Sequence, residues 1–195
     1  MHNGELVKSI LLAVLISIPI LGVPRTEDES SKMQRVHVLV KDDVIGVFVP
    51  AGKLVLIFDK GNFVQKEQKG SGGLASPRYF YFEDTNKGTI LSGWFEPASR
   101  FKGVEEDWAA NVKQWQGKPE LEPHQITTIS ESKWNGIMYH TKHPGGVRVH
   151  IKAHWVEADT WIDVHLSEAA IGGSEKAEEA LKKLLKSTAV KIVGK

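Results

Sequence analysis

The stretch VRVHIKAHWVEADTWIDVHLS, residues 147–167, decides the fold of this chain. Polar and apolar side chains alternate on both sides of Ala158 and Asp159, which is the period of a β-strand with one buried face. A two-residue turn at that point pairs Glu157 with Thr160 and predicts an antiparallel hairpin. The apolar side chains then share the face that should contact a helix: Ile151, Ala153, Trp155, Ile162, Val164 and Leu166. The hairpin is therefore expected to belong to an antiparallel sheet.

The sequence around this hairpin predicts further strands. Runs rich in β-branched and aromatic residues alternate with turn residues such as Gly, Pro, Asn and Asp. They lie at residues 36–40, 44–49, 53–58, 78–83, 89–95, 126–130 and 136–142. A glycine-rich stretch at residues 65–76 is expected to be an exposed loop.

Two stretches have the period of an amphipathic helix. In residues 104–116, Val104, Trp108, Val112 and Trp115 form one apolar stripe, so both tryptophans are expected in the core together with Trp155. The second helix begins at Ser174, the expected N-cap residue, and its apolar side recurs at helical spacing. We therefore predict an α+β domain in which a largely antiparallel β-sheet is flanked by two amphipathic helices.

Composition excludes several classes of protein. The chain has 195 residues, and its 25 Lys and Arg nearly balance 24 Asp and Glu, so it lacks the basic excess typical of nucleic-acid binders. It has no cysteine, which excludes disulfides, thiolate metal sites and cysteine nucleophiles. Its hydrophobic content of 41% is typical of a folded globular protein.

The N-terminal segment has the layout of an export signal. Residues 9–23 form an apolar run of 15 residues, whereas a membrane-spanning helix needs about 20, and Pro19 interrupts the run. We predict a signal peptide or membrane anchor at residues 1–25, with a cleaved signal favoured, a polar linker at 26–34 and a single domain at 35–195. Location outside the cytoplasm, in the periplasm for instance, follows from this prediction, and membrane contact is expected only through the N-terminal segment.

Four short stretches resemble one protein family. They are VFVP at residues 47–50, VEEDWAANVKQW at 104–115, WNGIMY at 134–139 and LLKST at 184–188. With the order of elements, they make the chain similar to the PsbP-like α/β/α sandwich family, which has small exported bacterial members. The resemblance implies the α+β sandwich. It also implies a docking or assembly role, since most members are not enzymes.

The polar face of the hairpin carries a cluster of histidines. On the predicted register His154 faces Asp163, which places two imidazoles and a carboxylate within reach of Zn²⁺ or Cu²⁺. The candidate ligands are His150, His154, Asp163 and His165, with His140 in reserve. Against a metal, Lys152 lies in the middle of the patch, where its ammonium would repel a dication. One alternative is a solvated or partly covered sheet face on which Asp163 accepts a hydrogen bond from His154. Another is a surface that gains charge near pH 6.5.

Trp94 and Trp161 are candidates for a recognition surface that contacts a peptide, a sugar or a partner protein.

The sequence contains no strong catalytic motif. Ser71 lacks the GxSxG setting of a serine hydrolase, and the acids at residues 105–107 suit the first turn of a helix, where its dipole favours negative charge. We therefore expect an exported, non-catalytic binding or assembly module with a protein partner in the cell envelope and no cofactor. The alternative is a Zn- or Cu-binding protein, and a third hypothesis is an enzyme that acts through the same polar patch.

Overall fold

The computed structural model describes residues 35–66 and 78–193. The predicted signal or anchor at residues 1–25 and the linker at 26–34 lie outside these residues, as does most of the glycine-rich loop with Ser71. The predicted strands and helices at residues 36–193 can all be compared with the structure, because the loop is the only gap among them.

The larger of two sheets has seven strands in the order β4-β5-β6-β10-β9-β8-β7, and every neighbouring pair is antiparallel. Its strands are β4 (Phe63–Gln65), β5 (Tyr79–Asp84), β6 (Thr89–Pro97), β7 (His124–Glu131), β8 (Trp134–His143), β9 (Gly146–Glu157) and β10 (Thr160–Ala169). The register predicted for the central hairpin is confirmed, since Glu157 faces Thr160 and His154 faces Asp163. Ala158 and Asp159 have φ values of 49° and 62°. Positive φ at both residues is what a two-residue type I′ turn requires.

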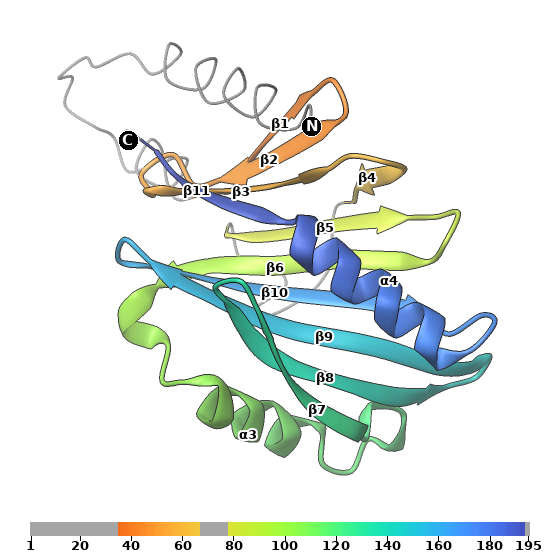
Figure 1. Ribbon diagram of the computed structural model, residues 1–195. Coiled ribbons are helices and arrows are strands. Elements are labelled where there is room, and N and C mark those ends of the chain that lie inside the picture. Colours follow the sequence, from red (N-terminus) through yellow and green to blue (C-terminus); the bar gives the residue numbers. More distant parts are fainter. Residues whose placement is uncertain (1–34, 67–77, 194–195) are drawn as a thin grey trace, which may run out of the picture.

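The smaller sheet has four strands in the order β1-β2-β3-β11, again antiparallel. It consists of β1 (His37–Lys41), β2 (Val44–Phe48), β3 (Leu54–Asp59) and β11 (Ala189–Ile192). The sequence did not predict β11, which is only four residues long and follows a helix directly. Because β11 pairs with β3, the C-terminal end of the described chain joins the N-terminal strands into a sheet of their own (Figure 1).

Two α-helices in the described part of the chain flank the larger sheet: α3 (Val104–Trp115) and α4 (Ser174–Ser187) (Figure 1). α4 packs on the apolar face of β9 and β10, as predicted, whereas α3 contacts β8 on the opposite face. Short 3₁₀ turns η2 (Ala98–Arg100) and η3 (Pro119–Leu121) precede and follow α3. The α+β prediction is therefore confirmed, with two antiparallel sheets in place of one.

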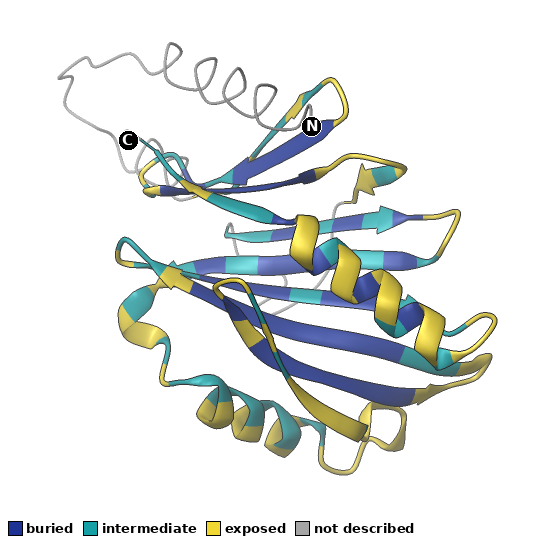
Figure 2. Cartoon of the chain, viewed as in Figure 1, coloured by how far each residue is buried: buried dark blue, intermediate teal, exposed yellow. Residues whose placement is uncertain are grey.

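The core lies between the larger sheet and the layer formed by α4 and the smaller sheet. Leu181 of α4 and Phe58 of β3 are buried in the same cluster as the apolar side of the β9–β10 hairpin. The rings of Phe58 and Phe82 are 5.2 Å apart and nearly perpendicular, which joins β3 to β5. Figure 2 shows the buried residues along β8, β9 and β10, while the outer side of α4 is exposed. Most of the buried apolar side chains therefore pack at the apolar face of the larger sheet.

Two local expectations were wrong. Gly173, not Ser174, is the N-cap of α4, and the cap makes no side-chain hydrogen bond. Trp108 and Trp115 are only partly buried, because α3 has no fully buried residue and lies on the polar face of the sheet. The expectation for Trp155 is confirmed, since it is 8% exposed.

Candidate functional site

The polar face of the central hairpin is covered, not solvated. The side chains of His150, Lys152, His154 and Asp163 are all buried. α3 lies over this face, and Asp107 in its first turn reaches Lys152 and His154. The result is a second interior layer, made of ionisable and aromatic side chains, between the larger sheet and α3.

Three aromatic rings are stacked across neighbouring strands in this layer. Tyr139 and His150 are 4.7 Å apart with ring planes within 9°, and His150 and His165 are 5.2 Å apart within 10°. His150 Nδ1 lies 3.1 Å from His165 Nε2, and its Nε2 lies 2.9 Å from the hydroxyl of Thr141. Burial lowers the pKa of His150 to about 2 and that of His165 to about 4, and it raises the pKa of Tyr139. All three rings are therefore neutral at pH 7.

Next to the stack, Lys152 forms a buried ion-pair network. Its ammonium lies 2.6 Å from Asp163 Oδ2 and 3.4 Å from Asp107 Oδ2. Burial disfavours the charge, but the two carboxylates outweigh it and raise the pKa of Lys152. Asp107 was not among the site residues predicted from the sequence, because an acid in the first turn of a helix is already explained by the helix dipole.

His154 is held by Trp161 and by the same two carboxylates. Its Nδ1 accepts the indole N–H of Trp161 at 3.2 Å, and its Nε2 lies 3.5 Å from Asp107 Oδ2. Burial, reinforced by the charge of Lys152, lowers the pKa of His154 to about 4. Asp163 Oδ1 lies 3.4 Å from Nδ1, but that nitrogen already accepts from Trp161 and has no proton to donate. Asp163 Oδ1 is accordingly buried without a hydrogen-bond partner among the residues that the structure describes.

The candidate metal ligands are only partly brought together. His154 and Asp163 are neighbours, and so are His150 and His165, but Lys152 lies between the pairs with its ammonium on Asp163. His140, the reserve ligand, is on the opposite face, where its Nε2 lies 3.1 Å from Glu178 of α4. Over residues 35–66 and 78–193, no group of three or more His, Asp and Glu side chains has the arrangement of a metal site. Binding of Zn²⁺ or Cu²⁺ stays a prediction.

The two candidate recognition residues line one open pocket of about 300 Å³ between α3 and the larger sheet. Trp94 and Trp161 lie on adjacent strands and are both partly exposed. The buried pair of Lys152 and Asp163 also lines the pocket. The other lining residues come from β6, η2 and α3: Glu96, Arg100, Asp107, Ala110, Asn111 and Gln114. The structure therefore places the recognition residues and the histidine patch in one region, which the sequence treated as two.

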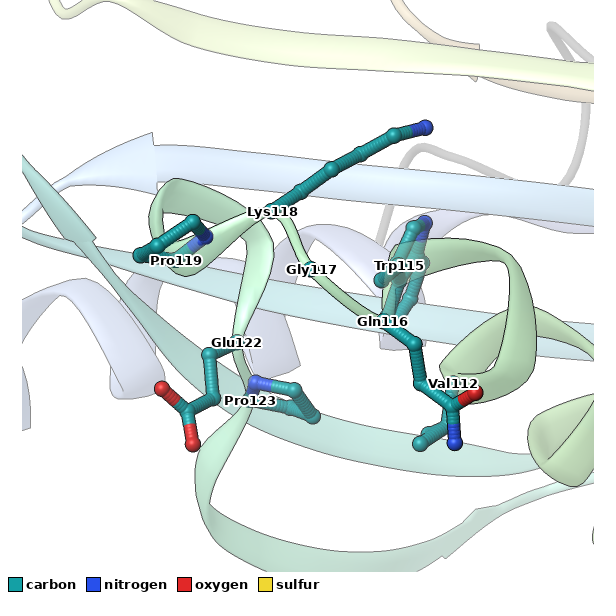
Figure 3. A pocket seen from close by; sticks show the side chains of 8 residues that line it. All are labelled: Val112, Trp115, Gln116, Gly117, Lys118, Pro119, Glu122 and Pro123. Atoms are coloured by element: carbon teal, nitrogen blue, oxygen red, sulfur yellow. The ribbon is translucent and has the colours of Figure 1, made fainter.

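A second pocket, of about 360 Å³, lies at the other end of α3. Trp115 and Val112 line it on the helix side, and Pro119 and Pro123 line it on the side of η3 (Figure 3). Trp115 packs 5.5 Å from Tyr139, so the aromatic stack continues toward this pocket. Its lining has one acid and one base, Glu122 and Lys118, and none of the buried ionisable groups. The pocket beside Trp94 and Trp161 is chemically the more distinctive.

Comparison with known proteins gives a likeness of fold. No family model and no curated protein matches the chain. The chain is similar over 90% of its length to the solution structure of cyanobacterial PsbP (CyanoP) from Synechocystis sp. PCC 6803, at 11% identity and a TM-score of 0.49, covering 99% of that protein. A crystal structure of a protein from Bacteroides thetaiotaomicron VPI-5482 is similar over 73% of this chain at 10% identity and a TM-score of 0.41. The chain spans about half of that protein, 46% of its length.

These likenesses concern the fold alone. No helix within the described ranges is long and apolar enough to cross a membrane.

Proposed function

We propose that this protein is an exported, non-catalytic binding module of the cell envelope, and that it holds a partner protein at the pocket between α3 and the larger sheet. The main observation behind the proposal is that one open pocket is lined both by Trp94 and Trp161 and by the buried ion pair of Lys152 and Asp163. Aromatic residues with a few convergent polar groups are typical of binding sites. Export is supported by the signal-like layout of residues 1–25.

A binding role is favoured over catalysis by the state of the ionisable groups. A general base at neutral pH needs a pKa near 7 and an accessible lone pair. His154 has a pKa of about 4, and its Nδ1 already accepts a hydrogen bond from Trp161. Lys152 is charged and tied to two carboxylates. These groups are suited to fixing the shape and charge of a pocket.

Site-specific photo-crosslinking in the producing cells tests the proposal. A photoreactive residue at Gln114 lies at the pocket, while one at the exposed Glu105 of the same helix is a matched control. We expect a defined protein adduct from Gln114 alone, formed in the envelope fraction and lost in a Trp94→Ala/Trp161→Ala background. Equal adducts at both positions, or adducts unaffected by the double variant, would contradict the proposal. So would retention of the full chain in the cytoplasm.

A further inference from the structure

The pocket between α3 and the larger sheet carries an excess of negative charge. Glu96, Asp107 and Asp163 supply three carboxylates, and Arg100 and Lys152 supply two cations. Both cations already have partners, because Arg100 lies 2.9 Å from Glu96 and Lys152 contacts both aspartates. One negative charge is therefore left without a counterion in the pocket.

One acceptor at this pocket also lacks a donor. Asp163 Oδ1 is buried and has no hydrogen-bond partner within the described part of the chain, while Oδ2 of the same carboxylate is held by Lys152. A buried carboxylate oxygen left in this state is energetically unfavourable. A donor that enters the pocket and displaces the side chains covering Oδ1 would remove that penalty, and a charged donor would also neutralise the excess carboxylate.

The aromatic walls of the pocket favour a flat cation. The Trp94 ring is held against Tyr79 at 4.6 Å, and the Trp161 ring against Phe101 at 5.3 Å, so both indoles are positioned before a partner binds. Indole is the best aromatic partner for a cation, and arginine stacks on aromatic faces more readily than lysine because its guanidinium is planar and weakly hydrated.

We propose that this pocket binds the guanidinium group of an arginine side chain of the partner protein, next to the indoles of Trp94 and Trp161 and with a hydrogen bond to Asp163 Oδ1. The inference rests on the proposed function and names the group that is recognised. Lys152 is compatible with it, because the ammonium occupies Oδ2 and leaves Oδ1 for the second cation. A neutral sugar could also donate to Oδ1 and contact indole, but it would leave the excess charge unbalanced.

The test uses the full chain labelled with ¹⁵N and the indole N–H signals of its six tryptophans. The probe is N-acetyl-arginine amide, and the matched control is N-acetyl-citrulline amide, which has nearly the same shape without the charge. We expect the arginine probe to shift the signals of Trp94 and Trp161 with a dissociation constant on the order of millimolar, as suits so few atoms. The signal of Trp115, in the other pocket, should stay in place. Citrulline should bind at least about tenfold more weakly.

Three variants locate the contact. Asp163→Asn should weaken binding of the arginine probe at least about tenfold, and Glu96→Gln should weaken it less, since Glu96 is shared with Arg100. Glu122→Gln, in the second pocket, should have no effect. If Asp163→Asn does not fold, Glu96→Gln and the comparison of arginine with citrulline still decide the matter, because neither removes a buried group.

The arginine inference and the proposed function can fail independently of each other. Equal binding of citrulline, or shifts caused by methyl β-glucoside and not by the arginine probe, would overturn the arginine inference. So would the absence of any shift at Trp94 and Trp161. In each case the crosslinking result at Gln114 decides independently whether the pocket binds a partner protein at all.

Discussion

Mild acid should destabilise this domain through its buried histidines. His154 and His165 have pKa values of about 4 in the folded protein, and His150 has a pKa of about 2, against 6.5 in an unfolded chain. Between pH 6.5 and pH 4 the unfolded chain therefore binds protons that the folded chain does not. Stability is fully present above pH 6.5 and is lost as the pH falls through that window.

The expected size of the effect follows from these pKa values. Between pH 7 and pH 5 each of the three histidines lowers the free energy of unfolding by about 2 kcal/mol, which gives about 6 kcal/mol for the group. Domains of this kind are stable by only about 5–15 kcal/mol. The protein should thus be close to unfolding at pH 5.

Urea unfolding at pH 7, 6 and 5, followed by tryptophan fluorescence, measures the change. The variant His154→Gln keeps an acceptor for the Trp161 indole and should remove about 2 kcal/mol of the difference between pH 7 and pH 5. His143→Gln, at an exposed position, is the matched control and should leave the difference unchanged. A wild-type loss below about 1 kcal/mol would refute the reasoning, because it would mean that the buried rings gain protons while the domain stays folded.

Three further predictions concern the two faces of the larger sheet. Leu181→Ala should lower the free energy of unfolding by about 2–5 kcal/mol in urea titrations, since this side chain is fully buried, whereas Leu121→Ala, at a position 36% exposed, should change it far less. Gly93→Ala should cost about 3 kcal/mol or more, or prevent folding, because its Cβ would overlap the backbone carbonyl of Asp163 on the neighbouring strand β10. A near-neutral effect would show that the two strands can separate. Calorimetric titration with Zn²⁺ and Cu²⁺ tests the metal hypothesis, which requires binding tighter than micromolar that His154→Ala/His165→Ala removes. Absence of heat in the wild type would end it.

The sequence predicted the central hairpin residue by residue, because two physical constraints agree there. Strict alternation fixes which side chains share a face, and a two-residue turn fixes the register. Once Glu157 faces Thr160, every later pair follows, including His154 with Asp163. The contact of the other face with a helix could also be predicted, because a row of apolar side chains has to be covered by another element of the fold.

Other features could not be predicted because local patterns do not say what a segment packs against. The stripe of Trp108 and Trp115 indicated a helix, but not that it would lie on polar side chains around Tyr139. Similarly, the early strands were correctly recognised, but their separation into a second sheet depends on β11, whose four residues carry little signal. Trp134, 1% exposed, is the most deeply buried tryptophan, and its indole donates to the carbonyl of Thr188. A single sequence gives no sign of that partner 54 residues away.

The two faces of one hairpin make opposite contributions to the protein. The side toward α4 is apolar and stabilises the fold by burial. The side toward α3 buries Lys152, Asp163, His150 and His154. Burying charges and neutral imidazoles is a poor way to gain stability, because their desolvation offsets much of the attraction. An apolar layer would hold α3 at least as well. The layer that is present instead leaves one carboxylate oxygen without a donor beside an open pocket. The proposed binding of an arginine side chain at this pocket would account for that composition.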